Sequence, residues 1–141
     1  MSYETVMVGL TAQMQAALPN RVVQRGMVLD PAGIRADDMA KGVLCLVATG
    51  GAGFWNFQGR EADGGDMDVT LVGFVEAPEK AKPVEVEQLE FAVLEDVLSF
   101  CKGIEFGNEL LAGLEPLSWR NSGGLETPNG WISIKLKVRW L

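Results

Sequence analysis

The sequence has 141 residues, an apolar content of 48% and a net charge of −7, a composition typical of one globular domain. The acidic balance argues against broad binding of nucleic acid or of an anionic membrane surface. The sequence contains no histidine, which excludes catalysis by histidine and metal sites with histidine ligands. Its two cysteines cannot complete a zinc site unless carboxylates or a second chain supply the other ligands. We predict a single domain over residues 1–141.

Both cysteines, Cys45 and Cys101, lie among apolar neighbours, so we predict buried thiols in a reduced, intracellular chain rather than a disulfide framework. The N-terminus lacks the basic start and apolar run of a signal peptide. No apolar run approaches the roughly 20 residues that span a bilayer. We therefore expect a soluble protein without a membrane partner.

The sequence pattern of the first 49 residues predicts one helix and two strands. Ser2 can cap a helix that ends before Pro19, because apolar residues recur at helical spacing after it. These residues are Tyr3, Met7, Leu10, Met14 and Leu18. A strand is predicted at 21–29, a polar connection at 30–42, and a strand at 43–49 that is apolar on both faces and therefore central.

Residues 50–66 have too many glycines for a helix and are predicted to form a long loop. Its aromatic cluster, Phe54, Trp55 and Phe57, either folds back as a small core of its own or anchors a partner. The glycines after the strand lack both the third glycine of a dinucleotide-binding turn and the lysine of a phosphate loop, so no nucleotide site is predicted.

Four acidic residues lie close together in the sequence just after the aromatic cluster. They are Glu61, Asp63, Asp66 and Asp68. Their spacing differs from that of an EF-hand, so a solvated acidic surface is the preferred interpretation and a weak divalent-cation site the alternative.

A strand is predicted at 67–77, followed by a charged hinge and a long helix at 84–103. Glu85, Glu87 and Glu90 suit the positive start of that helix, and its end carries Lys102 and Gly103. Its apolar residues form two adjacent stripes. One stripe can cover a sheet, and the second requires another helix or another subunit.

The chain closes with a short strand at 115–122, a turn at 122–130 and a strand from Trp131 in which apolar and polar residues alternate. The polar face of this last strand carries Lys135, Lys137 and Arg139. This basic face is either simply solvated or contacts the acidic middle of a neighbouring copy, with Glu61, Asp63 and Asp66 as its counterparts. In all, the elements predict an α+β fold with a mostly antiparallel sheet and two helices packed on one face.

The order of these elements resembles that of the tail terminator proteins of long-tailed bacteriophages, which cap the tail tube. The matching features are an opening helix that runs into AALPNRVVQRG, a glycine-rich loop before DVTLVGFV, a long helix after a charged hinge, and the final strand KLKVRWL. The resemblance covers nearly the whole chain and is one of order and pattern.

This resemblance implies a subunit of a homohexameric ring that binds the end of the tail tube, stops its polymerisation and presents a surface to the head-tail connector proteins. A head-to-tail contact forms such a ring only if the rotation between subunits closes. The protein would then belong to the virion tail, after assembly in the host cytoplasm. We predict no enzymatic activity, no cofactor and no recognition of a nucleic-acid sequence.

Two other classes of function remain open. The first is a small ligand-binding or dimerising accessory domain in which loop 50–66 lies over an apolar pocket. The second is an enzyme that uses carboxylates alone, for which the acid and the base cannot be recognised in the sequence.

Overall fold

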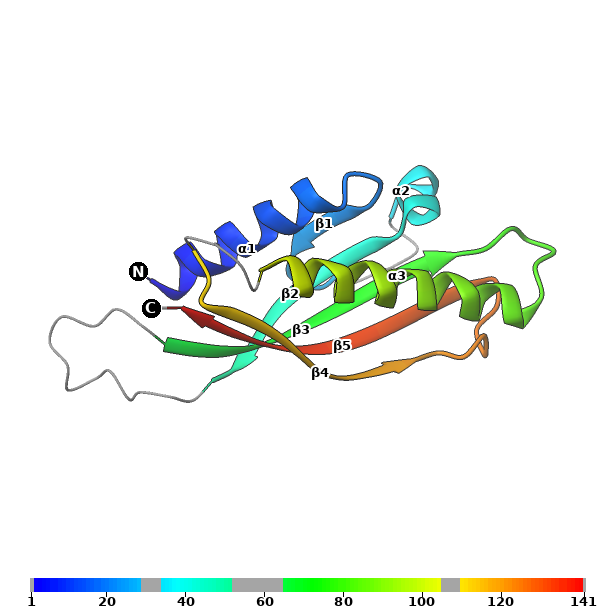
Figure 1. Ribbon diagram of the computed structural model, residues 1–141. Helices are drawn as coiled ribbons and strands as arrows, with labels where there is room; N and C mark the ends of the chain where they lie inside the picture. The colour runs from blue at the N-terminus through cyan, green and yellow to red at the C-terminus, as the bar shows by residue number, and fades with distance from the viewer. Residues whose placement is uncertain (1, 29–33, 52–64, 105–109, 141) are drawn as a thin grey trace, which may run out of the picture.

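The computed structural model describes residues 2–28, 34–51, 65–104 and 110–140, and it has an α+β fold (Figure 1). The elements in chain order are α1 (Tyr3–Ala17), β1 (Val22–Arg25), α2 (Ala36–Lys41), β2 (Val43–Gly50), β3 (Gly65–Glu76), α3 (Pro83–Ile104), β4 (Gly113–Asn121) and β5 (Asn129–Trp140). The predicted α+β class is confirmed.

The five strands form one sheet in the order β1-β2-β3-β5-β4. Only β1 and β2 run parallel; the other three neighbouring pairs are antiparallel, as predicted. The longest ladder joins β3 to β5, from the pair Gly65 and Trp140 to the pair Glu76 and Asn129. Helices α1 and α3 lie on the same side of this sheet (Figure 1), and we call that side the helix face and the opposite side the outer face.

Alternation along the strands assigns each side chain to one of these faces. On β2, Leu44 and Leu46 belong to the main core under α1 and α3. Val43 and Cys45 point the other way and pack with Met39 of α2 in a second, smaller core. The connection predicted at 30–42 thus contains a short helix, which covers one end of the outer face.

Helix α1 begins as the sequence predicts, because the Ser2 hydroxyl accepts a hydrogen bond from the N–H of Thr5 at 3.1 Å. Its inward residues Met7, Leu10 and Met14 are buried. Tyr3 is exposed, but its ring meets the ring of Trp140 edge-on at 5.0 Å between centroids. The start of α1 is therefore fixed to the end of β5.

The side chain of Gln15 covers the free edge of β1. Its oxygen accepts a hydrogen bond from the N–H of Val23 at 2.8 Å, and its nitrogen donates to the carbonyl of Arg21 at 2.7 Å. One amide group thereby makes contacts that a neighbouring strand would otherwise make. This edge of the sheet is partly closed by α1.

Helix α3 is the main cover of the helix face. Its first turn is closed by Glu85, whose carboxylate accepts a hydrogen bond from the N–H of Lys82 at 3.0 Å. Residues of both predicted stripes are buried in the same core, since Leu94 and Cys101 join Val93 and Val97 there. The sheet and α1, whose inward residues belong to the same core, therefore take up much of the surface for which another helix or another subunit is predicted.

Two glycines let α3 approach the sheet closely. A methyl group at Gly73 would lie 3.1 Å from a side-chain carbon of Val93, and one at Gly130 would lie 2.6 Å from Val86 and 2.8 Å from Glu90. Larger residues at these positions would push the helix outward. The distance between α3 and the strands thus depends on the lack of a side chain at Gly73 of β3 and at Gly130 of β5.

Glu90, which was predicted to lie at the polar start of α3, is instead fully buried. Its carboxylate accepts hydrogen bonds from the backbone N–H groups of Trp131 at 2.9 Å, Gly123 at 3.2 Å and Ser122 at 3.3 Å. The side-chain amide of Asn121 donates at 3.1 Å, and the Ser122 hydroxyl donates as well. One carboxylate therefore joins α3 to the end of β4, the start of the turn and the start of β5.

These donors explain why a carboxylate is tolerated in the core. A buried charge is costly unless hydrogen bonds replace its hydration. A carboxylate offers about four lone-pair sites, and five donors converge on it here. Charge-assisted bonds of this kind are roughly twice as strong as neutral ones.

We expect Glu90→Ala to lower the free energy of unfolding by about 3 kcal/mol, because it leaves a cavity in the core and removes the acceptor of the part-buried N–H of Trp131 and of the buried Ser122 hydroxyl. Glu90→Gln should cost about 1 to 3 kcal/mol, since its amide nitrogen would face other donors. Urea unfolding followed by circular dichroism measures both. The control is Glu95→Gln, an exposed position on the same helix, and an equal effect of Glu95→Gln and Glu90→Gln would contradict the role given to Glu90.

Candidate functional site

The predicted docking residues Phe54, Trp55 and Phe57, and the acidic residues Glu61 and Asp63, lie outside the described residues. Their roles in binding a partner or a neighbouring copy stay predictions. The remaining residues of the predicted subunit contact, Asp66, Lys135, Lys137 and Arg139, all lie on the outer face.

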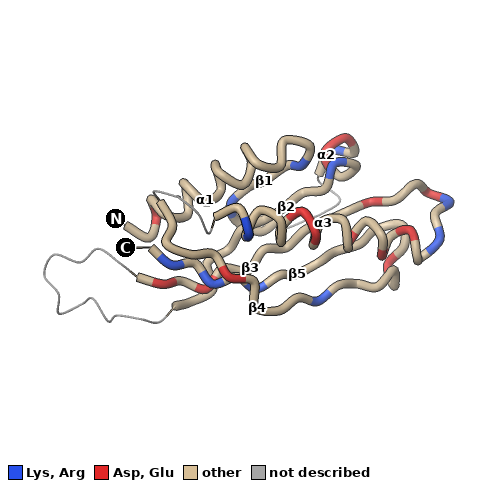
Figure 2. The backbone as a smooth tube through the Cα atoms, in the orientation of Figure 1, with Lys and Arg blue, Asp and Glu red and all other residues tan. Residues whose placement is uncertain are grey.

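The structure places most of these charges opposite one another within the same sheet. On β3 and β5, Asp66 pairs in register with Arg139, and Asp68 pairs with Lys137. On the other side of β5, Glu115 of β4 is the register partner of Lys137 and lies 3.9 Å from the guanidinium of Arg139. Acidic and basic residues therefore alternate across the strands at this end of the sheet (Figure 2). The opposite charges that suggested a contact between copies have counterparts inside one chain.

Lys135 differs from its two basic neighbours. Its register partners are Thr70 on β3 and Ser118 on β4, neither of which is charged. The side chain is exposed. Among the three basic residues, Lys135 is consequently the one best placed to attract an acidic group of another molecule.

We expect Lys137→Glu to lower the free energy of unfolding by about 1 kcal/mol at low salt, because it places a third carboxylate between Asp68 and Glu115. The loss should shrink at high salt, where these exposed charges are screened. Lys135→Glu is the matched control and should change stability by less than about 0.5 kcal/mol. Urea unfolding of both variants at two salt concentrations tests this difference, and similar losses for both would show that the cross-strand register does not matter.

A second surface lies where α3 meets the edge strand β4. Phe91 and Trp119 meet edge-on, with ring centroids 6.0 Å apart, yet they remain 36% and 46% exposed. Leu117, at the irregularity in the β4–β5 register, is 52% exposed but borders a hollow beside Thr70 and Lys135 on the outer face, so it lies apart from the aromatic pair. We call Phe91 and Trp119 the β4 edge patch. Large aromatic side chains gathered at a surface are typical of contact sites between proteins.

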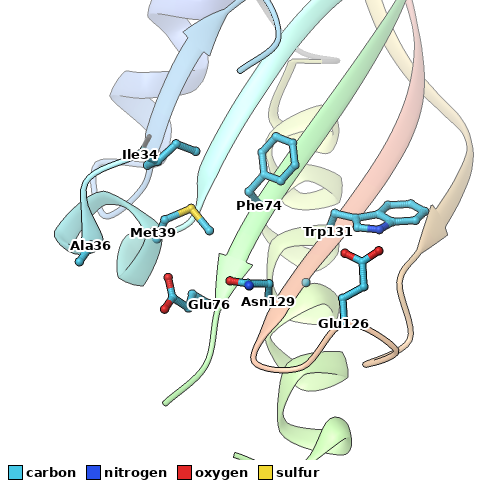
Figure 3. Close-up of a pocket in the computed structure, with 9 residues that line it drawn as sticks. Ile34, Ala36, Met39, Phe74, Glu76, Glu126, Asn129 and Trp131 are labelled. Carbon is cyan, nitrogen blue, oxygen red and sulfur yellow. The ribbon is translucent and has the colours of Figure 1, made fainter. Parts of the chain in front are cut away.

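A cleft of about 390 Å³ opens on the outer face, at the end of the sheet near α2 (Figure 3). It is lined by side chains from α2, β3, β5, the turn before β5 and the segment before α2. The residues that define it are Ile34, Met39, Phe74, Glu76, Glu126 and Trp131. Aromatic and aliphatic groups line most of it, and the carboxylates of Glu76 and Glu126 are the charged groups among the described residues of its wall. Figure 3 shows the carboxylate of Glu126 pointing toward the indole ring of Trp131.

The described residues offer little for covalent chemistry. Within them, no group of three or more cysteines, aspartates or glutamates is arranged to hold a metal ion. The Glu90 carboxylate is occupied by structural donors. None of the described helices combines the length and the hydropathy needed to cross a membrane.

The two thiols are buried and unpaired with each other. Burial raises the pKa of Cys101 to about 11, and burial also raises the pKa of Cys45. A raised pKa keeps each thiol protonated at neutral pH, so the nucleophilic thiolate is scarce.

We expect neither cysteine of the folded protein to react readily with iodoacetamide at about pH 8, because the thiolate is the reacting species. Reactivity should rise only as the pH approaches the raised pKa values. Both cysteines should be alkylated quickly in urea. Mass spectrometry counts the added groups, and rapid labelling of either residue in the folded protein would contradict the burial described above.

A comparison with protein-family models finds no match to this chain, and a comparison with curated proteins finds none either. The β4 edge patch and the outer-face cleft are absent from the sequence-based prediction. Trp119, a large aromatic residue in the short strand predicted at 115–122, is a signal that could have suggested the first. The cleft combines residues from five separate segments, so no local sequence pattern predicts it.

Proposed function

We propose that this chain is a structural assembly protein that caps the tail tube of a long-tailed bacteriophage as a ring, stops tube polymerisation and provides the surface for joining the head. The order of elements supports the proposal, since an opening helix, a hinge before a long helix and a long final strand are the features that the resemblance involves. The ring would be a homohexamer, and its partners would be the tail tube protein and the head-tail connector proteins.

The observation that carries the proposal is the β4 edge patch. Phe91 and Trp119 are large apolar side chains that their own chain leaves partly exposed. Fully burying a large apolar side chain that starts out exposed stabilises by roughly 1.5 to 3 kcal/mol, and burying the exposed part of these side chains would contribute a fraction of that to an association. A neighbouring subunit would supply that burial along the sheet edge that α1 does not reach.

The two edges of the sheet support a head-to-tail contact in particular. The β1 edge is partly closed by Gln15, whereas the β4 edge presents exposed apolar groups. Because the β1 and β4 edges differ, we expect the β4 edge to contact a different surface of the next subunit. A repeated contact of this kind forms a ring when the rotation between neighbouring subunits adds up to a full turn. Pro116 and the register irregularity beside it disfavour simple strand addition along β4, so the contact would be made by side chains.

We expect the purified protein to form a closed ring, with a mass of about 91 kDa for six subunits of 15.2 kDa. Trp119→Ala should weaken association about tenfold or more, because buried tryptophans dominate interface energies. Lys135→Glu should weaken it at low salt and less at high salt. Light scattering over a range of concentrations measures the mass, and negative-stain imaging shows the shape of the largest species.

Leu125→Ala is the matched control, since Leu125 is 91% exposed but lies on the turn before β5, outside the β4 edge patch. It should leave the mass unchanged, and circular dichroism should show that all three variants are folded. A protein that is monomeric at every concentration, with Trp119→Ala indistinguishable from the wild type, would contradict the ring. That outcome would favour the alternative, a small ligand-binding or dimerising domain.

A further inference from the structure

We propose that the outer-face cleft receives the side chain of an arginine from a different protein. The cleft combines the two features that a guanidinium group and its aliphatic stem require. One is a wall of aromatic and aliphatic side chains, and the other is a pair of carboxylates. This inference does not rest on the proposed ring, because it concerns a site within one copy of the chain.

The aromatic wall is formed by cross-strand neighbours. Phe74 of β3 and Trp131 of β5 are register partners on the outer face, and both are partly buried. Met39 of α2 is buried beside Phe74. A planar guanidinium stacks favourably on an indole, and the methylene stem of an arginine can lie along apolar surface.

The carboxylates stand at the same end of the cleft. Glu76 ends β3, and its register partner Asn129 begins β5, directly after the turn that carries Glu126. Both glutamates are exposed, and neither forms an ion pair with any residue in the described part of the chain. Carboxylates bind a guanidinium through paired N–H donors, a geometry that a lysine ammonium cannot reproduce.

Among the described residues that line the cleft, none is a lysine or an arginine. On β4, Arg120 has as its register partner Ser133, which is two residues beyond Trp131 on β5. Arg35, before α2, lies 3.9 Å from Asp37. The charge of the cleft wall is therefore negative, and it is complementary to a cation from outside.

The cleft is held in place by bonds already described. The N–H of Trp131 donates to the buried Glu90, which fixes the backbone beneath the indole. The turn that carries Glu126 is closed by a hydrogen bond from the N–H of Asn129 to the carbonyl of Glu126 at 2.9 Å. A preformed site loses less conformational entropy when a side chain enters it.

Most arginines in the described part of this chain already have an acidic partner within it, which favours an arginine from another protein. Of the five arginines in the described residues, four make ion pairs with acidic residues of their own chain. These are Arg21, Arg25, Arg35 and Arg139. Arg120 is the exception, so it is the residue to exclude as an occupant from a second copy.

The test uses N-acetyl-arginine amide as the probe and N-acetyl-citrulline amide as its neutral, nearly isosteric control. Both are titrated into the isotope-labelled protein, and the indole N–H resonance of Trp131, assigned with Trp131→Phe, is followed by NMR. We expect the arginine compound to shift this resonance with a Kd in the millimolar range. The citrulline compound should bind at least about fivefold more weakly, since it lacks the charge.

Glu76→Gln combined with Glu126→Gln should weaken binding of the arginine compound about tenfold. Glu115→Gln, an exposed carboxylate on β4 that does not line the cleft, is the matched control and should leave binding unchanged. Equal binding of the two compounds, no shift at saturating concentrations, or full binding by the double variant would each overturn the proposal. Arg120→Gln should leave the native mass unchanged, and a loss of self-association shared with the double variant would overturn the assignment to a different protein.

Discussion

The buried carboxylate of Glu90 is the interaction on which the arrangement of the two layers depends. Apolar contacts under α3 are strong but not directional, so they would tolerate small shifts of the helix along the sheet. Hydrogen bonds from three consecutive regions of the chain to one carboxylate allow only one position. Gly130 leaves the space in which that carboxylate sits. The position of α3, the turn before β5 and the outer-face position of Trp131 are thereby linked.

This linkage connects the two faces of the sheet. On the helix face, Glu90 fixes the backbone of Trp131 from below. On the outer face, the indole of the same residue forms a wall of the cleft. Phe91, the next residue on α3, packs on Trp119 in the β4 edge patch. Both candidate contact surfaces are therefore positioned by the same turn of α3, although they lie on different sides of the molecule.

Much of the fold could be predicted because its signals are local. The alternation of β5 and the helical period of α3 depend on neighbouring residues alone, and both elements lie close to their predicted positions. Glu90 could not be placed, because within the sequence it is one of several acidic residues near a helix start, where acidic residues are usually solvated. Its burial depends on donors 31 to 41 residues away.

The register in which β5 pairs with β3 and β4 could not be predicted from the sequence either. The basic residues Lys137 and Arg139 suggested a partner in another copy, and only the pairing with β3 and β4 reveals acidic residues opposite them. A shift of one residue would have moved them to the helix face. The cleft was missed for the same reason, since Phe74 and Trp131 become neighbours only through this register.

Because Gln15 covers part of the β1 edge, the two edges of the sheet differ in their ability to accept another strand. Strands can join a sheet only where N–H and C=O groups are unpaired, and here the amide of one helix residue already occupies such groups on β1. If two copies were ever to join strand to strand, both would have to use β4, and each outer end of the joined sheet would then be a β1 edge. Such a pair has little room for a third copy at either outer edge, so extension of the sheet by repeated strand addition is disfavoured.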